Sequence, residues 1–182
     1  MYDYNKILSF SFSPIINQKN NIISEEFEKN NFLKNIVITE KLDNCIVLSN
    51  QIDQKSFLAT SKINSESHIY PALKDLEIHG KYIKYNKESV FHISNIIDNR
   101  CGYYLSYKEL EYISNEISIP LIPIIYRGSF DLIGDLQKFL DKEIDKESFF
   151  GGPRRGLIVK TLHTFHNSDF NKVVAKYTKE TP

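Results

Sequence analysis

The chain has 182 residues, of which 41% are hydrophobic and 25% charged, and its 23 basic side chains equal its 23 acidic ones. A chain of this length and composition is long enough to bury a sizeable core, which excludes a disordered or fibrous protein. Zero formal net charge argues against a broadly polybasic nucleic-acid binder, but it leaves room for a local basic patch. We predict a single domain over residues 1–182.

Cysteine content and hydropathy bear on the compartment. Cys45 and Cys101 are too few for a disulfide framework, and the N-terminus lacks a charged-then-apolar signal pattern. No window approaches the roughly 20 apolar residues of a membrane span. We therefore expect a reduced, cytoplasmic protein.

The first predicted elements lie around a short charged segment. Residues 17–31 are polar and Asn-rich, which is typical of a surface segment or a short helix. Residues 35–39 and 45–48 are β-rich runs, and the Asp-Asn pair between them suits a tight turn. The pattern predicts a hairpin with Lys41 at its end.

The middle of the chain predicts two strands and a helix. Residues 81–85 and 90–97 have strand composition. Ser106-Tyr107-Lys108-Glu109 fits a capping box, in which serine and glutamate satisfy each other's amide donors. Leu110, Ile113 and Ile117 then recur at helical spacing, and Pro120 ends the pattern.

The last third alternates strands and a helix. Residues 121–126 predict a buried or edge strand, because Pro123 cannot donate to a ladder. A helix is predicted from after Ser129 to about Lys142. A charged connector over residues 143–150, a Gly-Gly-Pro turn over 151–153 and a core strand over 156–159 follow. Residues 173–177 are a further strand or the end of a short helix. The mixture predicts an α+β fold.

Two basic segments are candidates for chemistry. Lys41 is a covalent nucleophile if burial and nearby cations lower its pKa, or else an ordinary solvated turn lysine. Arg154 to Lys160 is followed by Lys176 and Lys179. If the two segments are adjacent strands, Lys160 and Lys176 line one groove that suits phosphates; the alternative is a plain basic sheet surface.

Two other groups of residues give weaker evidence for a functional site. His163 and His166 have no cysteine or carboxylate at zinc-ligand spacing, so the residues assign no metal ligand. Gly151-Gly152 precedes a strand, whereas a phosphate-cradling loop needs a following helix.

Taken together, the segments resemble the ATP-dependent RNA ligases. Glu40-Lys41-Leu42-Asp43 is similar to the nucleotidyl-acceptor motif Glu-Lys-x-Asp-Gly of that family. Further blocks resemble other parts of the family in the same order: Tyr4-Asn5-Lys6-Ile7 with Ser13, Tyr104-Leu105-Ser106 with the following helix, residues 119–128, Arg155-Gly156-Leu157-Ile158-Val159-Lys160 and Val174-Ala175-Lys176-Tyr177.

The resemblance implies an α+β nucleotidyltransferase core with antiparallel sheets around a nucleotide cleft. It also implies a three-step chemistry that uses ATP and Mg²⁺. The motif lysine forms a lysyl-AMP intermediate, the adenylate passes to an RNA 5′-phosphate, and a 3′-hydroxyl then seals the strand, as in RNA repair.

The same resemblance implies roles for individual residues. Lys41 is the nucleophile, Glu40 lies near the adenine and Asp43 near the ribose. Lys160 and Lys176 contact the phosphates. Arg155 and Lys179 are further phosphate-binding candidates.

The sequence departs from the family pattern at several positions. Asn44 replaces the motif glycine, Thr60 an arginine and Ser94 a base-stacking aromatic residue, unless Phe91 takes that role. Glu77 is a displaced candidate for a motif glutamate. Arg155 stands where the fourth motif has a glutamate that supports the metal, and like charges about 4 Å apart repel by roughly 4 kcal/mol near a protein surface.

Three functions are therefore open. The protein is an active ligase that uses Lys41, a degenerate member that binds nucleotide or RNA ends without sealing them, or a remnant of the fold with a structural or partner-binding role.

Charge is unevenly spread between the two parts of the chain. Residues 151–182 hold six basic and two acidic side chains, a net of +4, and residues 1–150 hold 17 and 21, a net of −4. The predicted anion site lies in the basic segment.

Overall fold

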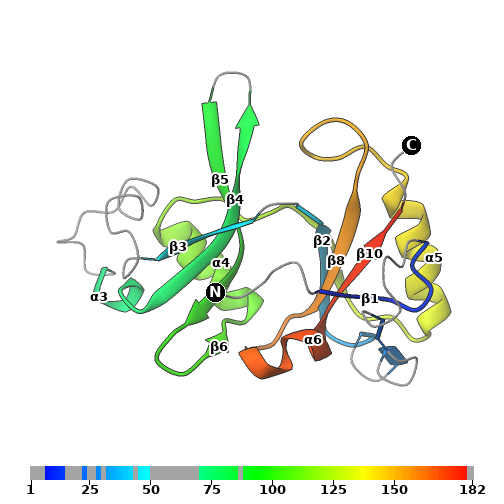
Figure 1. The fold of residues 1–182 in the computed structure, drawn as a ribbon, viewed down its shortest axis with the longest axis horizontal. Coiled ribbons are helices and arrows are strands. Elements are labelled where there is room, and N and C mark those ends of the chain that lie inside the picture. Colours follow the sequence, from blue (N-terminus) through cyan, green and yellow to red (C-terminus); the bar gives the residue numbers. More distant parts are fainter. Residues whose placement is uncertain are drawn as a thin grey trace. The chain divides into compact units, whose positions relative to one another are not determined.

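The computed structural model describes residues 7–14, 22–23, 28–29, 32–42, 45–49, 70–85 and 88–179. They belong to two compact units, each with its own sheet (Figure 1). The first unit is drawn from residues 1–43, 123–162 and 168–182, and the second from residues 44–122 and 163–167. Both mix strands with helices, which confirms the mixed fold class. The single domain predicted over the whole chain stays a prediction.

The first unit contains a five-stranded sheet. Its strands lie in the order β1 (Leu8–Ser9), β10 (Val174–Thr178), β8 (Gly156–Thr161), β2 (Ile36–Glu40) and β7 (Ile124–Gly128). The pairs from β10 to β7 are antiparallel, and β1 joins β10 in parallel. Helix α5 (Ile133–Ile144) and the short α6 (Phe170–Val173), which follows a 3-10 turn at Asn167–Asp169, also belong to this unit.

Helix α5 covers one face of this sheet. Its buried stripe packs against alternate residues of the three central strands, because side chains two apart on a strand share a face. The stripe and its partners are Leu136, Leu140 and Ile144 of α5 with Ile36, Ile38, Leu157, Val159, Ala175 and Tyr177. The helix starts later than predicted, at Ile133, and no side chain caps its first turn; the Ser129 hydroxyl accepts a hydrogen bond from the Asn35 amide.

The second unit contains an antiparallel five-stranded sheet. Its strands lie in the order β3 (Ile46–Ser49), β4 (Leu76–Tyr85), β5 (Glu88–Asp98), β6 (Tyr103–Tyr104) and β9 (Phe165–His166). Strands β4 and β5 form a long hairpin that confirms and extends the two strands predicted there. Helices α3 (Tyr70–Leu73) and α4 (Tyr107–Glu116) also belong to this unit.

The capping box predicted for α4 is confirmed. The Ser106 hydroxyl accepts from the Glu109 amide at 3.3 Å, and the Glu109 carboxylate accepts from the Ser106 amide at 2.7 Å. The predicted apolar face then packs on the sheet, with Leu110 and Ile117 buried in the second core. The cap and the apolar period thus agree on where this helix begins and what it covers.

One local prediction is wrong, and a second is confirmed only in part. The hairpin around Lys41 does not form, because β2 pairs with β7 and β8 while β3 pairs with β4 in the other unit. All five residues of β2 are buried, as expected of a strand with a neighbour on each side. The strand predicted at 121–126 begins only at Ile124, after Pro120 and Pro123, and it is an edge strand.

Some predictions fall outside the part of the chain that the structure describes. Most of the predicted surface segment 17–31 does so, as do the lead-in residues 4–6. Among the described helices, none is both long and apolar enough to cross a membrane.

Candidate active site

Lys41 directly follows the last residue of β2. Its amide donates a hydrogen bond to the carbonyl oxygen of Gly156 at 2.9 Å, which continues the pairing of β2 with β8 by one residue. The side chain is half-buried. The main chain of the predicted nucleophile is therefore fixed by the central strand of the sheet.

Gly156 leaves room for the Lys41 side chain. A Cβ atom at position 156 would lie 3.1 Å from Cδ of Lys41 and 3.0 Å from the carbonyl oxygen of Tyr177. Such distances are tight for any side chain, so the aliphatic part of Lys41 passes close over the backbone at this glycine. A glycine at the start of β8 is what permits this path.

Lys160 and Lys176 occupy adjacent strands, as predicted. In the antiparallel pair of β8 and β10, Lys176 lies opposite Ile158 and Val174 opposite Lys160. Directly opposite residues share a face, and so do residues two apart on one strand. Lys160 and Lys176 therefore lie on the same face of the sheet, which is the face away from α5.

Burial and mutual repulsion affect these amines. Burial lowers the pKa of Lys160, which is 5% exposed, to about 7. The pKa of Lys176 is also lowered, chiefly by burial and further by the positive charge of Lys41. That repulsion places the Lys41 charge close to Lys176. The amines of Lys41 and Lys176 therefore repel each other, on the sheet face that also carries Lys160, and the negative charge of a phosphate would relieve that repulsion.

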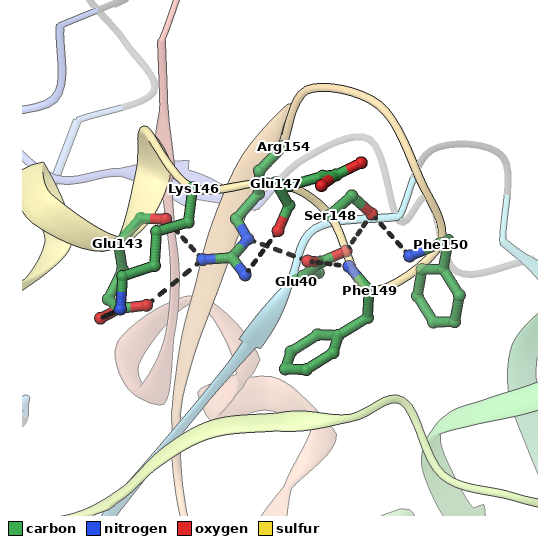
Figure 2. A network of polar contacts seen from close by, with 8 residues as sticks. All are labelled: Glu40, Glu143, Lys146, Glu147, Ser148, Phe149, Phe150 and Arg154. Carbon is green, nitrogen blue, oxygen red and sulfur yellow. Dashed lines mark hydrogen bonds and ion pairs between the residues drawn. The ribbon is translucent and has the colours of Figure 1, made fainter.

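Glu40 is directed to the opposite face. It shares the side of β2 that Ile36 and Ile38 present to α5, and its carboxylate is 3% exposed. Oε1 accepts from Nε of Arg154 at 2.8 Å and from the amide of Phe149 at 2.9 Å, and Oε2 accepts from the Ser148 hydroxyl at 2.7 Å (Figure 2). Its predicted place near the adenine stays a prediction.

Arg154 is the site residue that sequence reasoning missed. Sequence reasoning singled out its exposed neighbour Arg155, whereas Arg154 is buried between Glu40 and the end of α5. Its guanidinium donates to the main-chain oxygens of Glu143 and Glu147 and contacts the Glu143 carboxylate at 3.4 Å. Two adjacent arginines before a core strand could have signalled that one of them is buried, because neighbouring side chains diverge.

The remaining predicted residues fall into two groups. Asp43, Asn44 and Thr60 lie outside the described residues. The ammonium of Lys179 pairs with Asp145 at the surface.

The second unit holds three of the residues considered at the departures from the family. The Glu77 carboxylate accepts from Asn99 at 3.1 Å, and the Ser94 hydroxyl donates to the carbonyl of His79 at 2.9 Å. Phe91 is 3% exposed and belongs to the core of that unit, where its ring meets that of Tyr82 edge to face. These contacts account for the three side chains within their own unit.

The described residues do not provide an evident metal centre. Across those ranges, no three His, Cys, Asp or Glu side chains form a group able to hold an ion. The Glu40 carboxylate is held by Arg154, and position 155, where the resemblance expects a carboxylate, is an arginine. These residues do not fit a site built from a cluster of carboxylates, so we assign no metal ligand.

Known structures share this arrangement of strands and helices. One is Naegleria gruberi RNA ligase with PPi, at 17% identity and a TM-score of 0.59, covering 85% of this chain and 52% of that one. The chain has an RNA ligase-like fold. A variant of the same ligase with ATP and Mn matches at 14% identity and a TM-score of 0.62, covering 96% of this chain and 60% of that one.

The ligase-like fold is the extent of the likeness at this level of identity. A further variant with AMP and Mn matches at 16% identity and a TM-score of 0.62, covering 85% of this chain and 52% of the other. This chain thus spans about half to three fifths of the ligases that it resembles. No family model and no curated protein matches the sequence.

Proposed function

We propose that the protein binds ATP and that Lys41 takes up AMP from it, as in the first step of RNA ligation. The observation that carries the proposal is the placement of three lysines in a ligase-like fold. Lys160 and Lys176 share one sheet face, and the Lys41 charge is close enough to lower the pKa of Lys176. This set of amines suits a polyphosphate with an electrophilic phosphorus.

The proposed step is a phosphoryl substitution. The neutral amine of Lys41 attacks the α-phosphorus of ATP, an N–P bond forms, and the bond from that phosphorus to the bridging oxygen breaks. Pyrophosphate leaves, and the amine loses its proton to solvent. Lys160 and Lys176 stabilise the negative charge on the phosphate oxygens, since cations placed where charge develops lower the barrier.

The remaining roles belong to the same proposal. Asp43 contacts the ribose, Glu40 lies near the adenine through its main chain, and Arg155 and Lys179 are further candidates for binding phosphate. The adenylate then passes to the 5′-phosphate of an RNA, and a 3′-hydroxyl completes the seal. A divalent cation such as Mg²⁺ would neutralise phosphate charge when bound with the nucleotide.

A second function is favoured by one specific observation. Arg155 is exposed and stands where the ligase motif has a glutamate, and the described residues hold no carboxylate cluster. A cation there binds a phosphate directly but does not support a metal. The alternative is therefore a protein that binds nucleotide or RNA ends without transferring AMP.

Incubation with ATP labelled at the α-phosphate, followed by a denaturing gel, distinguishes the two functions. We expect label on the wild-type chain in the presence of Mg²⁺ or Mn²⁺ and none on Lys41→Ala. A lysyl-AMP bond is a phosphoramidate, so the label should survive alkali and be lost in acid. Lys138→Ala, at a lysine that is 83% exposed on α5, is the matched control and should label normally.

If the wild-type chain takes no label, calorimetry with ATP shows whether it still binds the nucleotide. Binding of ATP without label supports the second function, particularly if Lys160→Ala and Lys176→Ala weaken that binding. Label that persists in Lys41→Ala refutes the role of Lys41. Neither binding nor label excludes both functions.

A further inference from the structure

The carboxylate of Glu40 and the guanidinium of Arg154 form the centre of a buried polar network (Figure 2). The two side chains are 3% and 4% exposed, and they come from positions 114 residues apart. Glu143 and Lys146 extend the network, with Lys146 Nζ 2.6 Å from the Glu143 carboxylate. Two carboxylates and two cations therefore balance one another.

Stability alone is a poor explanation for this network. Removing two charges from water costs several kcal/mol per ion, and well-packed apolar side chains often replace a buried ion pair without loss. What an ion pair adds is directional contact. Arg154 uses three nitrogens to hold the end of α5, the loop at Glu147 and the last residue of β2.

The network meets the predicted nucleophile through the main chain. Glu40 is the residue before Lys41, and its carboxylate also accepts from the amide of Phe149 and the hydroxyl of Ser148. Two residues beyond Arg154, Gly156 accepts the hydrogen bond of the Lys41 amide at 2.9 Å. Arg154 thus contacts the end of β2, which precedes Lys41 in the sequence, and lies two residues before the point in β8 where the Lys41 amide is bound.

We propose that Arg154 and Glu40 are positioning residues that hold the Lys41 amine in line for attack on the α-phosphate. The inference rests on the proposed function, and it assigns the Glu40 side chain to the protein interior instead of to the nucleotide. Displacing a reacting group by about 1 Å can cost about 100-fold in rate. A fixed main chain at Lys41 is a direct way to avoid such a loss.

A double-mutant cycle tests this positioning. Glu40→Gln and Arg154→Met each leave one buried charge without its partner, so both single variants should lower the free energy of unfolding. The double variant removes both charges, and its stability should recover toward that of the wild type. Its rate of Lys41 labelling from ATP should remain about 10- to 100-fold below wild type, with the Kd for ATP unchanged.

Arg100→Met is the matched control. Arg100 makes a two-pronged ion pair with Asp98 in the second unit, at 64% exposure of its side chain, and its loss should leave the labelling rate as it was. A double variant that labels at the wild-type rate would overturn the inference. So would a labelling rate that simply follows stability across the cycle.

A second readout keeps the inference separate from the proposed function. Acylation of Lys41 by an amine reagent, measured by mass spectrometry relative to Lys138, needs no ATP. We expect Lys41 to react severalfold faster in the double variant, because the half-buried amine is released from its fixed path. If the wild type takes no label from ATP, the proposed AMP transfer is refuted. Independently of that result, unchanged acylation of Lys41 in the double variant would overturn the positioning inference.

Discussion

The buried amine of Lys160 makes stability depend on pH in a way that one substitution isolates. Lys160 lies near the end of β8, where β10 and β2 pair on either side of it, and is 5% exposed. Burial lowers its pKa in the folded protein to about 7, whereas an unfolded lysine titrates near 10.4. Lys160→Met keeps a long unbranched side chain and removes the titrating group.

The sign and size of the change in unfolding free energy with pH follow from proton linkage at Lys160. Between the two pKa values the unfolded chain binds one more proton at this site, so the free energy of unfolding rises with pH. The cost of burying the amine is fully present below the folded pKa and vanishes above the unfolded pKa. The slope is about 1.4 kcal/mol per pH unit, or on the order of 3 kcal/mol between about pH 7.5 and about pH 9.5.

Denaturant unfolding at several pH values measures this slope. The difference between wild type and Lys160→Met is the quantity to follow, because it cancels the other titrating groups. We expect the variant to be the more stable protein near neutral pH and its advantage to shrink as the pH rises. Lys138→Met, on the exposed face of α5, should show no such trend. A difference that stays constant across this pH range would refute the reasoning.

Two further comparisons test the packing. Gly80→Ala should lower the free energy of unfolding by about 1–3 kcal/mol, because the new Cβ would lie 2.1 Å from the carbonyl oxygen of His92; Gly134→Ala, which meets nothing within 4 Å in α5, should raise it by up to about 1 kcal/mol. Leu140→Ala should cost about 2–5 kcal/mol because that side chain is fully buried, whereas Leu132→Ala, at 64% exposure, should stay within about 0.5 kcal/mol. Thermal and denaturant unfolding check both pairs, and equal effects within either pair would contradict the packing described.

Elements with local signals were predictable from the sequence. The capping box at Ser106 and the apolar period after it define α4, and the stripe that includes Leu136 and Leu140 defines α5. Strand pairing was harder to predict, because the composition of a β-rich run does not indicate which other strand it pairs with. The Asp-Asn turn after Lys41 favoured a hairpin, yet burial on both faces of β2 needs a neighbour on each side.

The candidate site divides in the same way. Lys41, Lys160 and Lys176 could be selected from motif order, and the structure places the strands of the last two side by side. Glu40 could not be assigned a direction, since the predicted turn gave no reason for its side chain to enter the α5 core. Arg154 was overlooked because its neighbour Arg155 aligns with the motif glutamate and drew attention as a departure, and only tertiary contacts distinguish the buried arginine from the exposed one.

The order of the first sheet's strands along the chain determines which of its contacts can form while the protein is being synthesised. Domains generally fold as units while the chain is made from its N-terminus, and distant pairings form late. Lys41 is made early, but Arg154 comes 114 residues after Glu40, and Lys160 and Lys176 follow Arg154. The long β4–β5 hairpin, by contrast, pairs neighbouring stretches of sequence. A product that stops within α5 would therefore carry Glu40 and Lys41 but lack Arg154, Lys160 and Lys176.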